Sequence, residues 1–361
     1  MKRKIFLWGI FSGLFMALLL FQPLSGNLQA DAAKKLTVSF IDVGQGNASL
    51  IQYKGKNVLI DTGEEVSYQK LKNYLKKKNV SVIHNMILTH YDSDHMGSAD
   101  LVIDDFQVKK VSVSAYENDK KKTVQVKELN QAISGNRIKK AKLKAGQQVK
   151  VALGITLKVL SPKEDYGESN ENSVVLRLDH KKKSFLFTGD IDSKVEAEIY
   201  QKYKVDVDVV QIAHHGSDYA SGIQFLKKVS PEYAVISVGA DNSYGHPKST
   251  VLKRLTNFTK KILRTDKNGN IIFTSDGKKL TMKKDRGSYA TVSSSSQTAS
   301  GTKKSSATSQ KASGSFIGNK NTKVYHYAGC SYLPYAKNRV TFATEKEAKA
   351  AGYRLHSGCH N

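Results

Sequence analysis

Four side chains of types that commonly bind metal lie within the stretch THYDSDHMG, namely His90, Asp92, Asp94 and His95. The apolar residues before this stretch predict a strand that ends at His90, and a helix is expected to begin after His95. Alternate residues of the tight loop between them would then face two ions. His90 and Asp92 would face one ion, and Asp94 and His95 would face the other. Two neighbouring ions stabilise an in-line displacement at phosphorus or an attack on a carbonyl group.

Two distant strand ends offer further ligands. The apolar sequence FLFTG is followed by Asp190, which would lie between the two ions and bridge them. The apolar sequence VVQIA is followed by His214 and His215, and the position nearer the strand favours His214 as the ligand. A lone Asp or His at a strand end is usually structural, and the loop around Asp92 alone could be a solvated acidic loop. Taken together, the three segments predict a metal centre.

The elements that must position these residues alternate between strand and helix from residue 36 to residue 284, which predicts an α/β domain. The segments SYQKLKNYLKKK and SKVEAEIYQKY carry apolar residues three and four positions apart, as helices do. LTVSF, VVLRL and FLF are short apolar runs typical of strands. The polar residues fall at the carboxyl ends of strands, where α/β proteins build their sites.

Between Leu36 and Lys284 the chain resembles the metallo-β-lactamase superfamily, and more narrowly the hydrolase domain of ComEC-type DNA-uptake proteins. The resemblance rests on motifs that occur in the expected order: DVGQGN, LIDTG, THYDSDHMGS, NENSVVLRL, FTGD, HHGS and YGHP. Many superfamily members have histidine at the position of Asp92, whereas aspartate is usual in the ComEC-like branch. The resemblance implies an αββα sandwich over residues 35–284, with a two-metal site at one edge.

The ligand set that the resemblance implies for the two ions is His90, Asp92, Asp94, His95, Asp190 and His214. Asp94 is also expected to orient the nucleophile. The histidine that many members carry between the cluster and the bridging aspartate is absent, and Asn172 and Ser173 occupy that region. His180 is the only histidine in the interval, but DHKKK is typical of an exposed hairpin turn, which argues against it as a ligand.

The oxygen-rich first site favours a hard ion such as manganese, while the general order of affinities keeps zinc open. Asp61 of LIDTG and His215 are expected to orient ligands without binding metal themselves. His246 of YGHP is expected to act as a general acid or to hold a substrate phosphate. Bracing of its own loop is the alternative for His246.

Residues 1–32 have the pattern of an export signal. The basic start MKRK precedes an apolar run from Ile5 to Phe21, and Ala30 and Ala32 offer a small-residue cleavage site. Because the run is at the lower limit of transmembrane length, an uncleaved anchor is the alternative. Cleavage predicts a secreted or cell-surface protein with no remaining membrane span.

The formal net charge of +25 is strongly basic. Such a charge attracts polyanions, above all nucleic acid, with cell-wall polymers and anionic lipids as alternatives. Composition does not determine the oligomeric state.

The chain changes character after the α/β domain. Eleven of the thirty residues from 286 to 315 are Ser, and such a segment cannot bury enough apolar surface to fold. Residues 286–318 are therefore expected to be a flexible linker to a second unit at 320–361.

The second unit contains both cysteines of the chain, each close to a histidine. His326 and Cys330 form one pair, and His356 and Cys359 form the other, at spacings typical of zinc sites. A disulfide is the alternative, but it leaves the paired histidines unexplained. The unit resembles the small zinc-binding module of the Ada DNA-repair protein, with histidines in place of two cysteines, and the resemblance implies one structural zinc.

These features predict an exported two-metal hydrolase that cleaves phosphodiesters, most plausibly in extracellular DNA. One alternative is a small-molecule hydrolase, such as a lactonase or an esterase, on the same scaffold. A second alternative is a DNA- or wall-binding protein that retains the hydrolase fold without activity.

Overall fold

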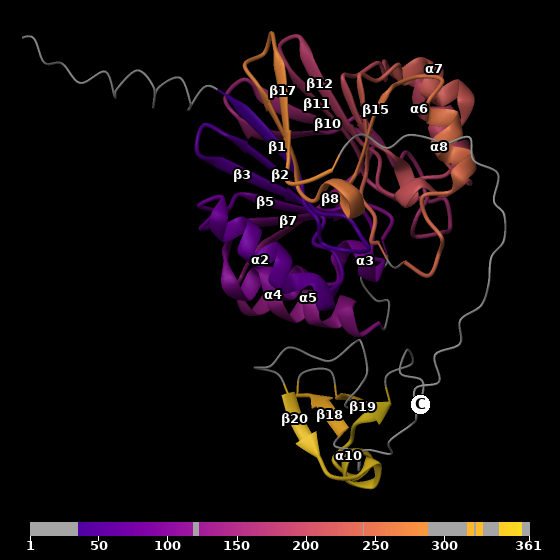
Figure 1. Cartoon of the computed structure of the whole chain (residues 1–361). Helices are drawn as coiled ribbons and strands as arrows, with labels where there is room; N and C mark the ends of the chain where they lie inside the picture. The colour runs from indigo at the N-terminus through magenta and orange to yellow at the C-terminus, as the bar shows by residue number, and fades with distance from the viewer. Residues whose placement is uncertain are drawn as a thin grey trace, which may run out of the picture.

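The computed structural model describes residues 35–117, 123–240, 242–287, 316–320, 323–327 and 339–355. Most of them form an α/β sandwich, drawn in Figure 1. Within these residues, no helix is both long enough and apolar enough to cross a bilayer.

The first half of the sandwich runs from residue 36 to residue 143. Its elements are β1 (Leu36–Phe40), β2 (Ser49–Tyr53), β3 (Lys56–Ile60), η1 (Glu65–Ser67), α2 (Tyr68–Lys77), β4 (Val82–Ile83), β5 (Asn85–Leu88), α3 (Ser93–Met96), α4 (Ala99–Asp105), β6 (Gln107–Val108), β7 (Lys110–Ser114), α5 (Val124–Gly135) and β8 (Lys139–Leu143).

The second half runs from residue 148 to residue 284. Its elements are β9 (Gln148–Ala152), β10 (Ile155–Ser161), β11 (Val175–His180), β12 (Lys183–Phe187), α6 (Ser193–Lys202), β13 (Val209–Gln211), η2 (Ala213–Gly216), α7 (Ile223–Val229), β14 (Tyr233–Ile236), α8 (Ser249–Leu255), β15 (Lys261–Arg264), α9 (Thr265–Asn268), β16 (Ile271–Ser275) and β17 (Leu280–Lys284).

Two large sheets face each other. One has the order β17-β16-β1-β2-β3-β5-β7-β8, and the other has the order β15-β14-β13-β12-β11-β10-β9. Helices α2, α4 and α5 cover the outer face of the first sheet, and α6, α7 and α8 cover that of the second (Figure 1). The order helix, sheet, sheet, helix confirms the αββα sandwich expected from the sequence.

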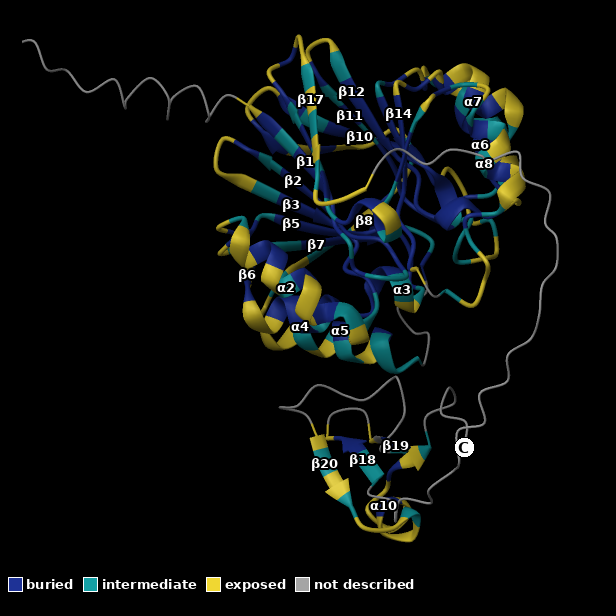
Figure 2. Ribbon diagram, in the orientation of Figure 1, coloured by how far each residue is buried: buried dark blue, intermediate teal, exposed yellow. Residues whose placement is uncertain are grey.

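Three apolar clusters fill the three interfaces of this sandwich, and Figure 2 shows them as buried segments between exposed helix faces. Between the sheets, the ring of Phe40 lies 5.8 Å from that of Phe187 and 6.0 Å from that of Phe273. Full burial of each such ring contributes roughly 1.5–3 kcal/mol to folding. On α2, Leu71 and Leu75 are fully buried while Lys76 is exposed, which is the amphipathic pattern read from the sequence.

The parallel strands of both sheets bring their carboxyl ends to one edge. In the first sheet β3 pairs with β5 in parallel, and in the second β12 pairs with β13 in parallel. Asp61 follows β3, His90 lies two residues beyond β5, Asp190 lies three residues beyond β12, and η2 follows β13. The polar residues from both halves therefore meet at the same edge of the sandwich.

One local expectation is wrong. The segment after His90 is not an extended loop, because Asp94 and His95 lie on the short helix α3. The carbonyl oxygen of Asp92 accepts the backbone N–H groups of His95 and Met96, each at 3.0 Å, and this starts the helix. Helical winding, rather than alternation along an extended chain, sets the directions of the two side chains.

The C-terminal unit is small. Its described elements are β18 (Phe316–Asn319), β19 (Val324–Tyr327), β20 (Arg339–Phe342), α10 (Glu345–Ala350) and β21 (Arg354–Leu355). The strands form one sheet in the order β20-β18-β19-β21, packed through Tyr325, Ala348 and Tyr353. Strand β18 pairs with β19 and β20 and begins at Phe316, so part of this sheet lies inside the range 286–318 expected to be linker.

Candidate metal centre

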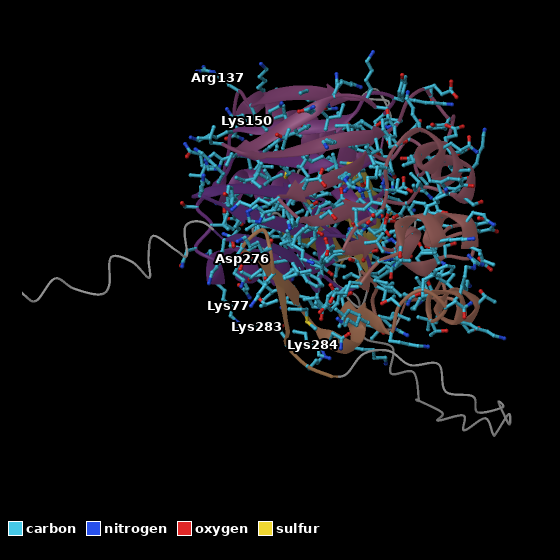
Figure 3. The ribbon with its side chains drawn as sticks, turned by 90° about the horizontal axis from the view of Figure 1, so that it is seen from above. Lys77, Arg137, Lys150, Asp276, Lys283 and Lys284 are labelled. Atoms are coloured by element: carbon cyan, nitrogen blue, oxygen red, sulfur yellow. The ribbon has the colours of Figure 1, made fainter. Side chains whose placement is uncertain are left out.

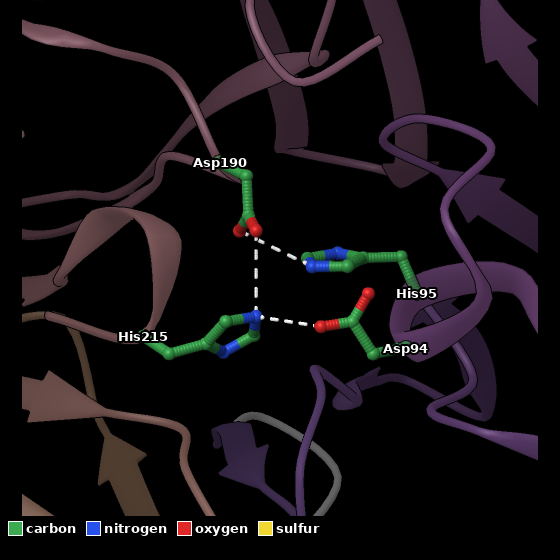
Figure 4. Close-up of side chains that lie close together, drawn as sticks. All are labelled: Asp94, His95, Asp190 and His215. Atoms are coloured by element: carbon green, nitrogen blue, oxygen red, sulfur yellow. Dashed lines mark ion pairs between the residues drawn. The ribbon is translucent and has the colours of Figure 1, made fainter. Parts of the chain in front are cut away.

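Four side chains converge at the shared edge of the two sheets, as Figure 4 shows: Asp94, His95, Asp190 and His215. One potential ligand atom from each lies within 4.8 Å of the others. His95, Asp190 and His215 are at most 3% exposed. Three segments far apart in the sequence, namely α3, the turn after β12, and η2, supply these residues.

The distances in this cluster suit a shared ion. His95 Nε2 lies 3.1 Å from Asp190 Oδ1, and His215 Nε2 lies 3.3 Å from Asp190 Oδ2 and 3.0 Å from Asp94 Oδ2. Nevertheless His95 Nε2, His215 Nε2 and Asp190 Oδ1 are buried without a partner in hydrogen-bonding geometry. Ligand atoms held about 2.0–2.2 Å from one ion lie roughly 3.0–3.5 Å apart. The four residues therefore fit a divalent metal ion.

The other nitrogen of each imidazole is held by the protein. His95 Nδ1 lies 2.8 Å from Asp61 Oδ2, and Asp61 Oδ1 accepts the backbone N–H of Thr89 at 2.7 Å. His215 Nδ1 donates to the carbonyl oxygen of Ser237 at 2.8 Å. Such bonds set the tautomer and ring orientation of a metal-binding histidine. Both Nε2 atoms are thereby directed at the centre of the cluster.

Charge pairing inside the cluster raises the pKa values of the two histidines and lowers that of Asp190. Burial lowers the pKa of His95, but the carboxylates of Asp190 and Asp61 outweigh burial and raise it well above its ordinary value. Burial likewise opposes the rise at His215, where Asp190 and Asp94 raise the pKa to about 10. Burial raises the pKa of Asp190, but the imidazoles of His95 and His215 hold it well below its ordinary range. Without an ion, protons on the two imidazoles balance the carboxylates.

His90 and Asp92 lie beside this cluster but do not join it. The ring of His90 is 4.0 Å from that of His95, and its Nε2 is buried without a hydrogen bond. Asp92 Oδ2 is 4.0 Å from His90 Nε2, and the Asp92 side chain is 41% exposed. Burial, and then the neighbouring His95, lower the pKa of His90 to about 4, so this imidazole is neutral at physiological pH.

Asn172 and Ser173 have different surroundings. The amide of Asn172 accepts the backbone N–H of Tyr166 and donates to Asp165, so it braces the loop beside the site. Ser173 Oγ lies 3.2 Å from His90 Nδ1 and accepts the backbone N–H of Asp190 at 3.1 Å. Ser173 thus connects His90 to the turn that carries the central aspartate.

The sequence favours His214 as the ligand and His215 as its neighbour outside the cluster, and the structure shows the reverse arrangement. His215 belongs to the cluster, whereas the side chain of His214 is 27% exposed, with its Nε2 3.9 Å from Asp190 Oδ2. Both residues have positive φ, at 50° and 54°. This turn follows β13 and breaks the alternation of side chains that a strand would impose, so proximity to the strand does not identify the inner residue.

His180 also differs from its expectation. It is the last residue of β11, only 2% exposed, with Nδ1 3.0 Å from Ser275 Oγ. It is therefore not on an exposed turn. It does lie at the end of β11 away from the cluster, because β11 runs antiparallel to β12.

Close backbone contacts explain two glycines of the motifs. In DVGQGN, a Cβ on Gly46 would lie 2.2 Å from the carbonyl oxygen of Asp94, and its φ is +117°. In FTGD, a Cβ on Gly189 would lie 2.8 Å from Ser173 Cβ, with φ at +57°. Gly46 thus lets the backbone approach Asp94 of the cluster, and Gly189 lets it approach Ser173 beside the cluster, where any side chain would displace these neighbours.

His246 lies at the rim of the site. Its ring is 5.8 Å from that of His214, and its Nδ1 is buried without a hydrogen-bond partner. Burial, followed by the charges of His215 and His214, lowers its pKa to about 4. A neutral imidazole is a poor proton donor at pH 7, so this environment favours a substrate-holding role over general-acid catalysis.

A pocket of about 630 Å³ opens beside Asp92. The carboxylates that line it are Asp92, Glu117, Asp165, Glu168 and Glu171. Glu117 is braced there, since its Oε1 accepts the backbone N–H of Tyr91 and the hydroxyl of Ser169. Sequence reasoning missed this acidic pocket, because its residues come from three separate segments with no common motif.

Of the four residues expected to hold a structural zinc, only His326 lies among the described residues. It is on β19 and 4% exposed. Cys330, His356 and Cys359 lie outside the described residues. The structural zinc remains a prediction.

A family model of the metallo-β-lactamase superfamily matches residues 41–240. ComE operon protein 3 of Bacillus subtilis (strain 168) is 30% identical over 258 residues, which cover 65% of this chain and 32% of that protein. Competence protein ComA of Neisseria gonorrhoeae is 30% identical over 251 residues, covering 68% of this chain and 33% of that protein. The chain thus spans about a third of the length of these relatives. A diphosphatase from the PhnP family aligns with a TM-score of 0.40 at 12% identity, over 63% of this chain and 94% of that one.

Proposed function

Since the chain belongs to the metallo-β-lactamase superfamily, we propose that it is an exported phosphodiesterase that uses two divalent ions to cleave extracellular DNA. The observation that carries the proposal is the convergence of unpartnered donor atoms from His95, Asp190 and His215 on one point. The similarity to a competence protein and a ComE operon protein favours a nucleic-acid substrate.

The proposed chemistry assigns different tasks to the residues. When bound, divalent ions supply Lewis-acid polarisation of a phosphate and make water a stronger acid. Asp190 would hold an ion together with His95 and His215, whose Nε2 atoms lie 3.1 Å and 3.3 Å from its two oxygens, and we propose that it also serves a neighbouring ion at His90. Asp94, whose side chain is 20% exposed, would accept a hydrogen bond from the attacking water. His246 would hold the substrate at the rim.

The identity of the ions is part of the proposal. Asp92 in place of a histidine makes the half of the centre with His90 richer in oxygen, which favours manganese there, with zinc as the alternative. The cluster of two imidazoles and two carboxylates suits either ion. We further propose a structural zinc on His326, Cys330, His356 and Cys359, which metal analysis of the full chain combined with a thiol count would test. A disulfide and no zinc in excess of the hydrolase site would reject it.

The basic charge of the chain is proposed to attract DNA or cell-wall polyanions from a distance. Figure 3 labels Lys77 and Arg137 on one side of the domain. Arg137 precedes β8, which runs parallel to β7 and so begins at the end of the sandwich opposite the cluster. The positive charges of Lys77 and Arg137 can help to steer a polyanion toward the protein without touching the reacting bond.

The test is direct cleavage. The full chain should be incubated with plasmid DNA and with single-stranded DNA in the presence of manganese, beside an Asp94→Ala variant and a panel of phosphate esters and lactones. We expect DNA cleavage that the variant lacks and that a chelator abolishes. Intact DNA alongside a cleaved small ester would reject the nuclease.

The acidic pocket beside Asp92 favours a second candidate, a hydrolase of small phosphate or carboxyl esters. Its carboxylates repel a polyanion and suit a neutral or cationic substrate group. The same substrate panel separates the two candidates. If esters with a cationic group are cleaved far faster than DNA, the second candidate replaces the first.

A further inference from the structure

Three aromatic rings lead outward from the metal cluster. The ring of His214 is 6.2 Å from that of His215 and 5.8 Å from that of His246. The ring of Tyr244 is next, 5.7 Å from that of His246 and inclined to it by only 20°. The first two contacts are edge-to-face, and the last is an offset stack. Tyr244 is therefore connected to the cluster through a continuous series of packed rings.

Tyr244 is exposed although its turn is firmly held. Its side chain is 63% exposed. The amide of Asn242 donates to the carbonyl oxygens of Gly239 and His246, and its oxygen accepts the backbone N–H of His246. Lys248 Nζ donates to the carbonyl oxygen of Tyr244 at 2.8 Å. The ring is thus presented to solvent by a braced turn beside the reacting centre.

We infer that Tyr244, stacked on His246, is a platform for a nucleobase of the substrate strand. The inference rests on the proposed phosphodiesterase function and names the feature of the substrate that this side of the site recognises. A base would lie against the tyrosine ring while the phosphate next to it reaches the cluster. The ammonium group of Lys248 lies under the same turn and adds positive charge where the strand would pass.

Physical chemistry favours a base as the partner of this ring. Every base has a π-face, so stacking on an aromatic side chain tolerates any sequence. Because the turn is braced before the substrate arrives, little entropy is lost when the base binds. Because the rings of Tyr244 and His246 are inclined by only 20°, a base on Tyr244 would continue the stack that these two rings form.

Tyr219 provides a matched control. It is 74% exposed and lies on the chain four residues after His215. Among the described residues, no ring contact joins Tyr219 to a histidine of the site. The Tyr219→Ala substitution therefore removes exposed aromatic surface near the site and leaves the stacked rings of Tyr244 and His246 in place.

The first experiment compares two substrates that share a leaving group. Thymidine 5′-(p-nitrophenyl phosphate) carries a base, whereas methyl p-nitrophenyl phosphate does not. In Tyr244→Ala, we expect the preference for the thymidine ester, measured as the ratio of the two kcat/KM values, to fall roughly 5- to 100-fold, mainly through KM. Tyr244→Phe should keep the ratio within about twofold, because the ring remains. Tyr219→Ala should leave the ratio unchanged.

The second experiment separates this inference from the proposed function. The Asp94→Ala variant of the full chain would be titrated against fluorescein-labelled oligothymidine and against an abasic strand of equal length, with fluorescence anisotropy as the readout. We expect tighter binding of oligothymidine, and loss of that difference when Tyr244→Ala is added. Equal binding of the two strands, or a difference that survives Tyr244→Ala, overturns the platform even if the enzyme cleaves DNA. Absence of cleavage with the binding difference intact overturns the nuclease and keeps the platform.

Discussion

The two halves of the proposed metal centre differ in how much coordination the chain can supply. In one half, Asp94, His95, Asp190 and His215 converge within 4.8 Å, and three of these residues are buried. In the other half, His90 is buried but Asp92 is 41% exposed and 4.0 Å away. The first arrangement can hold an ion with protein atoms alone, while the second leaves positions for water or substrate.

This asymmetry suggests a division of labour. A closed set of protein ligands holds an ion firmly, whereas an open set lets a substrate oxygen enter the coordination shell. The open half also faces the pocket beside Asp92, so water or a small substrate group can reach it from there. We therefore expect the four-residue half to govern metal retention and the half with His90 to govern turnover.

The largest effect should come from Asp190, the residue proposed to bridge the two halves. Asp190→Ala should lower kcat/KM roughly a thousandfold or more, because a buried bridging charge is lost and the two imidazoles of His95 and His215 then repel each other. Kinetics with a small phosphodiester, together with metal content by mass spectrometry, would measure this. Asp179→Ala is a suitable control, since Asp179 pairs with Arg177 and Lys158 on a strand of the same sheet. Retention of two ions and of activity in Asp190→Ala would contradict the bridging position.

The adjacent histidines offer a sharper comparison. His215→Ala should weaken metal binding about a hundredfold, because His215 Nε2 points at two carboxylates of the cluster. His214→Ala should weaken it about tenfold at most, since its Nε2 is 3.9 Å from Asp190. Competition with a fluorescent chelator measures both affinities. The reverse order would restore His214 as the inner ligand.

A smaller effect is expected at the open half. Asp92→Ala should reduce the bound metal from about two ions to about one per chain and lower kcat about ten- to hundredfold, because one oxygen ligand of the open half is lost. Mass spectrometry of the dialysed protein gives the ratio. Glu168→Ala, in the wall of the same pocket, should leave the ratio unchanged. An unchanged ratio in Asp92→Ala would show that Asp92 does not bind the ion.

Sequence patterns predict the fold of this protein better than its centre. The α/β character of the domain follows from alternating strands and helices, because burial periodicity is local and repeats many times, and the αββα sandwich is implied by the resemblance to the metallo-β-lactamase superfamily. The neighbourhood of His90, Asp94, His95 and Asp190 follows from their positions at strand ends, which parallel pairing brings together. Both features depend on the order of strands and helices along the chain and on which end of a strand a residue follows, and the sequence contains this information.

Features that depend on single turns could not be predicted in this way. The exchange of His214 and His215 arises from two residues with positive φ, a conformation that the sequence HHGS does not reveal. The helix α3 begins at Ser93 because Asp92 ends the extended chain, which turns a supposed loop into a helical turn. The acidic pocket needs the loops at Glu117 and Glu168 to meet across the fold, and no spacing in the sequence encodes that.

The two halves should also differ in how metal binding depends on pH. The pKa of His215 is raised to about 10, so this imidazole carries a proton at pH 7 that an ion must displace. The pKa of His90 is lowered to about 4, so filling the open half releases no proton from it. The apparent metal affinity of the closed half should therefore rise up to about tenfold per pH unit for each proton released between pH 6 and pH 9, while that of the open half stays nearly constant.

Calorimetric titration of the metal-free protein in buffers with different ionisation enthalpies counts the protons released on metal binding, and the Asp92→Ala variant reports the closed half alone. Proton release that is equal for both halves would mean that they share one electrostatic environment.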